Sequence, residues 1–279
     1  MEWKNLLRGF AMGTTDLIPG VSGGTLAVIL GIYYRLLEAI SGLFSKDWKR
    51  HWGFVVPLGI GMLAAIVSLS RLIEYLLEHH YAATQFFFMG LILGVLPMLI
   101  RQADVRRNFS GKHVIVLIAG LLLMASMAFL SGDKDADPQT TLTLWSTIRL
   151  FFSGWLASLA MLLPGVSGSF VLLLIGAYPT AINALSTFNF PIIFAIGFGV
   201  LAGFFFSSKG IRYLLATYPH MTYAVMIGLI TGSVFVIFPG FVSGAGAFVV
   251  CLATFFAGLF IAMYFGSVRR EPAKAQPPV

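Results

Sequence analysis

Charged residues are scarce in this sequence. Only 10% of its 279 residues are Asp, Glu, Lys or Arg, whereas 58% are hydrophobic. A soluble domain of this length needs far more charge to cover its surface, so the composition excludes a soluble globular protein. The 18 basic residues, which give a net charge of +7, cluster at the ends of apolar runs. No basic soluble segment is left to bind nucleic acid.

Cysteine is nearly absent as well. Cys251 is the only one and lies in an apolar run, which excludes a disulfide within the chain and a cysteine metal site. The sequence therefore predicts neither a cofactor nor a metal centre. The first apolar stretch contains Asp16 and lacks a cleavage site, so we expect no cleaved signal peptide.

Long apolar runs dominate instead. Six are long enough to cross a hydrocarbon layer about 30 Å thick; they lie at 54–73, 84–100, 113–130, 192–208, 221–238 and 245–264. Two further stretches, 6–41 and 144–186, are interrupted by Pro and Gly. The limb before the first break has about 13 residues, roughly 20 Å of helix, which is too short to cross. We expect two re-entrant hairpins; two full spans in place of each hairpin is the alternative.

The chain contains an internal repeat. IPGVSGGTLAVILGIY at 18–33 recurs as LPGVSGSFVLLLIGAY at 163–178, an offset of 145 residues, with seven of sixteen residues identical. A second block of matching glycines and a Tyr-Leu-Leu run follows at an offset of 138. Two collinear blocks argue against chance. We predict an all-α polytopic membrane protein with halves 1–135 and 136–279, each a re-entrant helical hairpin plus three transmembrane helices, the second ending in a short disordered tail.

Each half crosses the membrane three times, so the second half starts on the side opposite to the first and is inverted relative to it. With the N-terminus inside, fourteen of the eighteen basic residues fall on the inner side, as the positive-inside rule requires. We therefore expect both termini and the 101–112 loop in the cytoplasm, and the acidic 132–141 loop outside.

Each break carries residues suited to phosphate. Helix ends near the membrane midplane form the substrate sites of inverted-repeat transporters, and free amides at a helix N-terminus bind anions. The candidate substrate-binding residues are Ser22, Gly23, Gly24 and Thr25 in the first break and Ser167, Gly168 and Ser169 in the second. One such break alone is more often a tight turn; two symmetric copies favour a site.

Asp16 and two arginines complete the candidates. A carboxylate in a membrane segment is a functional hypothesis by default. Asp16 is predicted either to carry a coupling H⁺ or Na⁺ or to cap the hairpin amides. Arg35 and Arg71 either reach out to the two interfaces or line the route of an anionic headgroup.

The segments MGTTDLIPGVSGGTLAVILGIYYRL at 12–36 and MLLPGVSGSFVLLLIGAYPTAI at 161–182 resemble the bacterial undecaprenyl-phosphate translocase family of the PopT type, long described as a domain of unknown function. The resemblance covers essentially the whole chain. It implies a plasma-membrane flippase that returns polyprenyl phosphate (undecaprenyl phosphate) from the outer to the inner leaflet for recycling. Many relatives carry an acidic residue where this chain has Tyr34, which weakens an ion-coupling role there.

Two other functions share some of these features. An ion-coupled transporter of a small anion has the same architecture and differs in whether its cavity opens to lipid. Gly-Val-Ser-Gly also matches the nucleophile sequence of rhomboid-like intramembrane serine proteases. A serine hydrolase needs a base within reach, yet all five histidines fall at segment ends or in loops. We therefore expect a transporter, not an enzyme.

Overall fold

The computed structural model describes residues 2–17, 21–43, 45, 48–129 and 142–268. Within these residues the chain forms thirteen helices and no strand. The helices are α1 (Lys4–Asp16), α2 (Gly23–Ile29), α3 (Tyr33–Gly42), α4 (Trp48–His79), α5 (Tyr81–Gln102), α6 (Val105–Asn108), α7 (Gly111–Met127), α8 (Leu144–Leu162), α9 (Gly168–Leu174), α10 (Tyr178–Ser186), α11 (Phe190–Thr217), α12 (Pro219–Ile237) and α13 (Ala245–Val268). The 132–141 loop, the C-terminal tail, Pro19 and Gly20 lie outside the described residues.

The chain is a multi-pass membrane protein. Helices α4, α5, α11, α12 and α13 are long and apolar enough to cross a bilayer, which accounts for five of the six expected spans. The sixth corresponds to α7, an apolar helix of 17 residues. The two interrupted stretches fold as α1–α2–α3 and α8–α9–α10, and α9 meets α10 at a bend of 110°.

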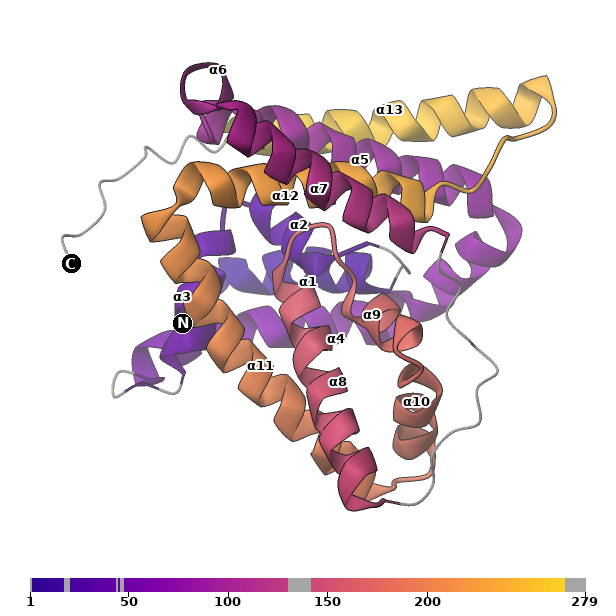
Figure 1. The fold of residues 1–279 in the computed structure, drawn as a ribbon. Helices are drawn as coiled ribbons and strands as arrows, with labels where there is room; N and C mark the ends of the chain where they lie inside the picture. The colour runs from indigo at the N-terminus through magenta and orange to yellow at the C-terminus, as the bar shows by residue number, and fades with distance from the viewer. Residues whose placement is uncertain (1, 18–20, 44, 46–47, 130–141, 269–279) are drawn as a thin grey trace.

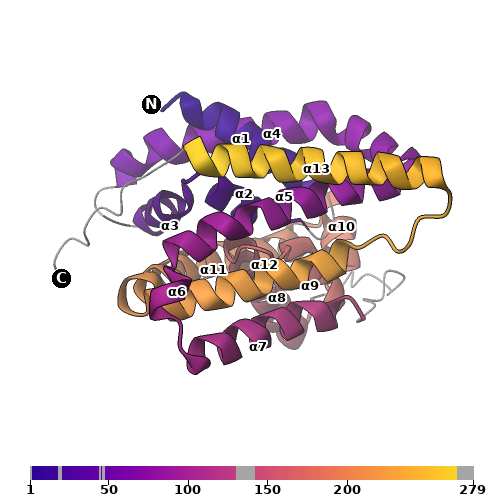
Figure 2. The same cartoon turned by 90° about the horizontal axis from the view of Figure 1, so that it is seen from above.

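Four long helices lie side by side in the order α13, α5, α12, α7 (Figures 1 and 2). The outer pairs, α13 with α5 and α12 with α7, make two of the most extensive helix contacts in the molecule. The other two extensive contacts join α1 to α4 and α8 to α11. By the repeat, the α1–α4 pair corresponds to the α8–α11 pair, and the α5–α13 pair corresponds to the α12–α7 pair.

Glycine lets the backbones approach closely in these pairs. A Cβ at Gly61 of α4 would lie on the carbonyl oxygen of Leu6 in α1, and a Cβ at Gly199 of α11 would lie on that of Phe151 in α8. Gly61 and Gly199 are related by the 138-residue offset, and Leu6 and Phe151 by the 145-residue offset. Small residues of this kind bring membrane helices into backbone contact.

The same correspondence holds in the four-helix row. A Cβ at Gly90 of α5 would meet the carbonyl oxygen of Phe255 in α13, and a Cβ at Gly228 of α12 would meet that of Leu117 in α7. Gly90 and Gly228 are 138 residues apart, and so are Leu117 and Phe255. The contacts thus recur at the spacing of the sequence repeat, although each of these pairs joins helices from opposite halves.

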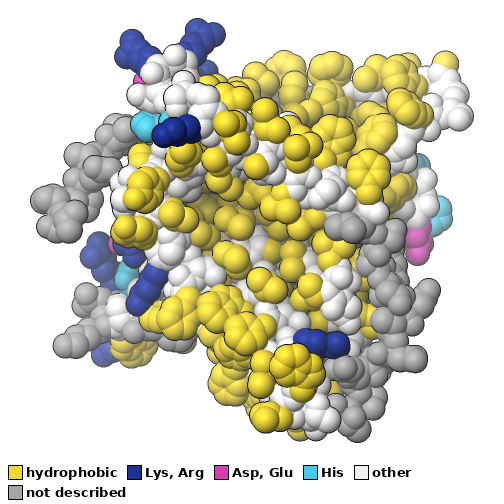
Figure 3. All heavy atoms as spheres, in the orientation of Figure 1, with side chains coloured by type: hydrophobic (Ala, Val, Ile, Leu, Met, Phe, Trp, Pro, Cys, Tyr) yellow, Lys and Arg dark blue, Asp and Glu magenta, His cyan; other side chains and the backbone are white. Residues whose placement is uncertain are grey.

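The largest buried cluster surrounds the first hairpin. It includes Leu37 of α3, Ile92 and Leu99 of α5 and Ile230 of α12, all nearly or fully inaccessible. On the outside, hydrophobic side chains cover most of the face seen in Figure 3, and most Lys and Arg side chains lie at its margins. An apolar belt with basic margins fits a molecule surrounded by lipid.

Candidate functional site

Helices α2 and α3, which follow the first motif, bond directly to the second Pro-Gly-Val-Ser-Gly break and the end of α8. The Gly165 N–H of the second break donates to Thr25 Oγ1 of α2 over 2.8 Å. The Tyr33 hydroxyl of α3 donates to the Leu162 carbonyl at the end of α8, also over 2.8 Å. Gly165 has a φ of +90°, a conformation that glycine adopts without strain. Segments more than 120 residues apart in sequence are therefore joined through their motifs.

In the first break, the amides of Gly23 and Gly24 at the start of α2 are already paired. Ser22 has an extended backbone and its Oγ accepts from the Gly24 N–H over 3.2 Å, as an N-cap residue does. The Gly23 N–H donates to Asp16 Oδ1 over 2.8 Å. Of the two roles expected for Asp16, the capping contact is thus present. An anion approaching this helix end must compete with the Asp16 carboxylate for the amide.

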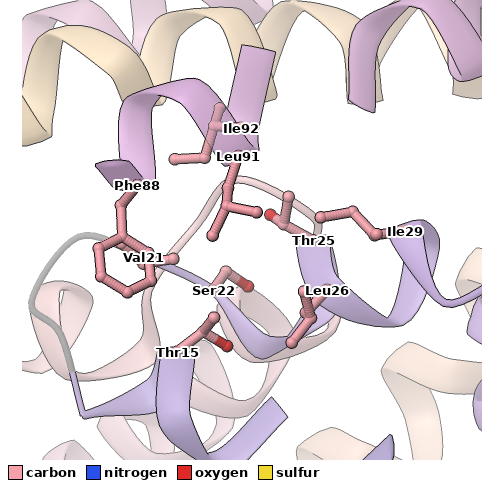
Figure 4. A pocket seen from close by; sticks show the side chains of 9 residues that line it. All are labelled: Thr15, Val21, Ser22, Thr25, Leu26, Ile29, Phe88, Leu91 and Ile92. Atoms are coloured by element: carbon pink, nitrogen blue, oxygen red, sulfur yellow. The ribbon is translucent and has the colours of Figure 1, made fainter. Parts of the chain in front are cut away.

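The space beside the first break is small. Thr15, Ser22 and Thr25 face Phe88, Leu91 and Ile92 of α5 across a cavity of about 10 Å³ (Figure 4). A volume of this size holds about one water molecule. It is too small for a phosphate group, so in this conformation the first break is closed.

The second break is arranged differently. The Ser167 and Ser169 hydroxyls lie 3.0 Å apart, and Ser167 makes no side-chain cap bond to α9. Met161 stands where the repeat places Asp16 in the first half, and a Cβ at Gly168 would contact it. Ser169 is exposed, whereas the residue it aligns with, Gly24, is buried. In the part of the chain that the structure describes, no carboxylate caps this helix end.

A groove opens between α9 and α10. Its volume is about 710 Å³. It is lined by polar and apolar side chains from both helices: Ser169, Phe170, Leu173, Tyr178, Pro179, Ile182, Asn183 and Ser186. The 110° bend between the two helices creates this space. A pocket of this volume accommodates a small-molecule ligand.

The two candidate arginines do not join the motif residues. Arg35 forms an ion pair with Glu2 and lies 5.2 Å from the centre of the Phe54 ring. Arg71 is exposed on α4 and makes no hydrogen bond or ion pair with the part of the chain that the structure describes. Neither contacts a motif residue through such a bond.

Three polar residues outside the sequence prediction occupy notable positions. Asn183 lines the groove. Arg212 of α11 donates to Ser41 Oγ of α3 over 2.7 Å and lies 5.9 Å from the Tyr34 ring centre. The sequence could have indicated Tyr33, because the same residue recurs in the second copy of the repeat as Tyr178. It could not have indicated the contact of Arg212 with α3, because α11 lies far from α3 in the sequence.

The motif serines have partners that do not activate a nucleophile. Ser22 bonds a backbone amide and Ser167 bonds another serine. Catalysis by serine needs a base held against the hydroxyl. Within the described residues, no group of three or more metal-ligating side chains gathers either.

Comparisons with known proteins agree on one family. Residues 12–248 match the model of the VCA0040-like family, described as undecaprenyl phosphate translocase-like. A protein from Staphylococcus aureus named polyprenyl-phosphate transporter is 44% identical over 97% of this chain and 98% of its own length. One of the same name from Vibrio cholerae is 35% identical over 84% of this chain and 76% of its own. No solved structure matches. With this match over most of its length, and with both breaks of the paired motif inside it, the chain belongs to the undecaprenyl phosphate translocase-like family.

Proposed function

We propose that this protein translocates a polyprenyl phosphate, such as undecaprenyl phosphate, from the outer to the inner leaflet of a bacterial plasma membrane. The observation that carries the proposal is the amphipathic groove beside the second motif break. A lipid phosphate needs polar contacts for its headgroup next to a path for its tail through hydrocarbon. Two relatives that match most of the chain carry the name polyprenyl-phosphate transporter.

The proposed architecture is an inverted repeat of 1–135 and 136–279, each half a re-entrant hairpin and three crossings. Support comes from the backbone contacts that recur at the repeat offsets, such as Gly61 with Leu6 and Gly199 with Phe151. Symmetric halves around a central site are the usual design of transporters that open to one side at a time. In this arrangement both termini are cytoplasmic, and the groove of the second hairpin faces the outer leaflet.

Within this scheme the headgroup first contacts the second break. Among the described residues, no carboxylate bonds to Ser167, Gly168 or Ser169 there. Ser22, Gly23, Gly24 and Thr25 take the corresponding role when the first break opens toward the inner leaflet. Arg35 and Arg71 act as cationic guides at the two interfaces, where an anionic headgroup arrives or leaves.

Coupling to H⁺ or Na⁺ is proposed to involve Asp16. Its carboxylate accepts the Gly23 amide over 2.8 Å. A phosphate that binds the same amide displaces this carboxylate, and two anions close together in a low-dielectric site repel. Uptake of a proton or a sodium ion by Asp16 relieves that repulsion. The transport step is thereby linked to the ion.

The proposal is tested in vesicles containing the purified protein and a polyprenyl phosphate placed in one leaflet. We expect the parent to speed leaflet exchange and to respond to an imposed pH or sodium gradient. Gly168→Leu should abolish exchange, because its Cβ would clash with Met161 and the Ala157 carbonyl of α8 and displace the start of α9. Asp16→Asn should keep exchange but lose the response to the gradient.

The controls separate these conclusions. A neutral polyprenol measures exchange that does not depend on the phosphate. If folded parent protein exchanges no polyprenyl phosphate, the function is wrong. If Asp16→Asn responds to the gradient as the parent does, Asp16 is only a capping residue.

A further inference from the structure

The groove between α9 and α10 has two chemical characters. Phe170, Leu173 and Ile182 give it apolar walls, whereas Ser169 and Asn183 bring polar atoms to it. Among the residues that the structure describes, none of those lining it is a carboxylate. Such a surface suits a ligand that has an anionic end and a hydrocarbon end.

Hydrogen-bond donors in the groove remain available. Neither the Asn183 carboxamide nor the Tyr178 hydroxyl bonds to another side chain or backbone group among the described residues. The hydroxyls of Ser186 and Thr187 donate to the backbone carbonyl of Asn183, not to its side chain. Neutral donors without a nearby acid bind a phosphate oxygen without charge repulsion.

The surroundings of the groove are apolar and open. Ile175, between the two helices, and Leu185 of α10 are exposed hydrophobic side chains that do not line the groove. In a membrane these side chains contact lipid. A ligand tail can therefore pass from the groove into hydrocarbon without crossing a polar barrier.

The equivalent surface of the first hairpin is a packed interface. Tyr33 is 7% exposed and bonds to Leu162, whereas Tyr178 at the same repeat position is 38% exposed. Ser41 is buried and accepts a hydrogen bond from Arg212, whereas its counterpart Ser186 is exposed and lines the groove. The surface that forms the groove in the second hairpin is therefore covered by other helices in the first hairpin.

We propose that the α9–α10 groove binds the phosphate and the first prenyl units of a polyprenyl phosphate, with Asn183 as the principal headgroup donor. Ser169 is the second donor, and Phe170, Leu173 and Ile182 contact the tail. The proposal rests on the function proposed above and adds residues outside the motifs. It assigns the capture step to this groove rather than to the buried first break.

Binding to the full-length protein in lipid nanodiscs tests this proposal. The probes are a short-chain polyprenyl phosphate and the polyprenol of the same length. Asn183→Asp should weaken binding of the phosphate more than tenfold and leave the polyprenol unchanged, because it replaces a donor with a negative charge. Ser186→Trp should weaken the binding of both ligands by a similar factor, because the indole fills the groove.

Leu185→Trp is the matched control. It adds the same side chain at the preceding position of α10, outside the groove, and should leave both affinities within twofold of the parent. The groove assignment is wrong if Ser186→Trp and Leu185→Trp act alike, or if Asn183→Asp affects the phosphate and the polyprenol equally. If the parent exchanges polyprenyl phosphate while Asn183→Asp and Ser186→Trp bind it normally, the groove assignment is wrong but the proposed function stands. If the parent binds no polyprenyl phosphate, both proposals fail.

Discussion

The first and second hairpins carry nearly the same motif but are covered differently. Leu37 in α3 is completely buried, whereas Ile182 at the equivalent position in α10 is 49% exposed. The difference is that a long helix covers only the first hairpin. Helix α11 packs on α3, and its Arg212 bonds to Ser41. By the repeat, α4 corresponds to α11, but within the described residues it makes no extensive contact with α10 and has Glu74 at the position of Arg212. The two copies of the repeat unit are therefore packed differently within one structure, which fits the proposal above that the halves open to one side at a time.

The largest effect is expected where the halves are alike. Gly61→Val and Gly199→Val should each cost about 3 kcal/mol of unfolding free energy, because each added side chain pushes two helices apart. Gly59→Val and Gly197→Val are the controls, since a Cβ at either position meets nothing within 4 Å. Denaturant unfolding in micelles measures all four. Equal losses in target and control would show that helix propensity, not close packing, sets the cost.

The next prediction concerns the covering of the hairpins. In a Cys251→Ala background, Ser186→Cys should react with a maleimide at least tenfold faster than Ser41→Cys, because a thiol reacts only when it is accessible as the thiolate. Similar rates in native membranes would mean that the two hairpins are equally covered there.

The same method gives the orientation of the chain. In intact cells an impermeant reagent should label Ser186→Cys but not Arg107→Cys, because the 101–112 loop is expected in the cytoplasm. Labelling at position 107 from outside would reverse the assignment of sides.

The smallest effect concerns the two tyrosines. Tyr33→Phe should lower the unfolding free energy by about 1 kcal/mol, because it leaves the buried Leu162 carbonyl without its donor. Tyr178→Phe should change it by less than about 0.5 kcal/mol, since that hydroxyl is outside the packed core. The same micelle measurement compares them. Equal losses would remove the energetic distinction between the hairpins.

Much of this arrangement could be predicted from the sequence. Apolar run length located five long spans, and Pro and Gly located the broken stretches, because both signals are local. The aligned glycines of the repeat turned out to be the points of backbone contact. Asp16 was expected to reach the hairpin amides as one of two alternatives, and its seven-residue separation from Gly23 made that contact short-range.

Other features depend on distant packing. Arg35 was expected to guide a headgroup or reach an interface, and nothing local indicated its ion pair with Glu2. The open second hairpin could not be foreseen either, because both breaks share one motif. Its exposure depends on whether a helix from elsewhere in the chain covers α10, which is a property of the conformation.

The pairing of α5 with α13 has a consequence for biosynthesis. Helix α5 leaves the ribosome well before α13, yet the carbonyl of Phe255 in α13 lies against Gly90 of α5. Until α13 is inserted, the small-residue face of α5 has only lipid or an insertion factor as a neighbour. The N-terminal half therefore cannot complete its packing during its own synthesis, and a ribosome that stalls before α13 leaves a chain whose first half is unfinished.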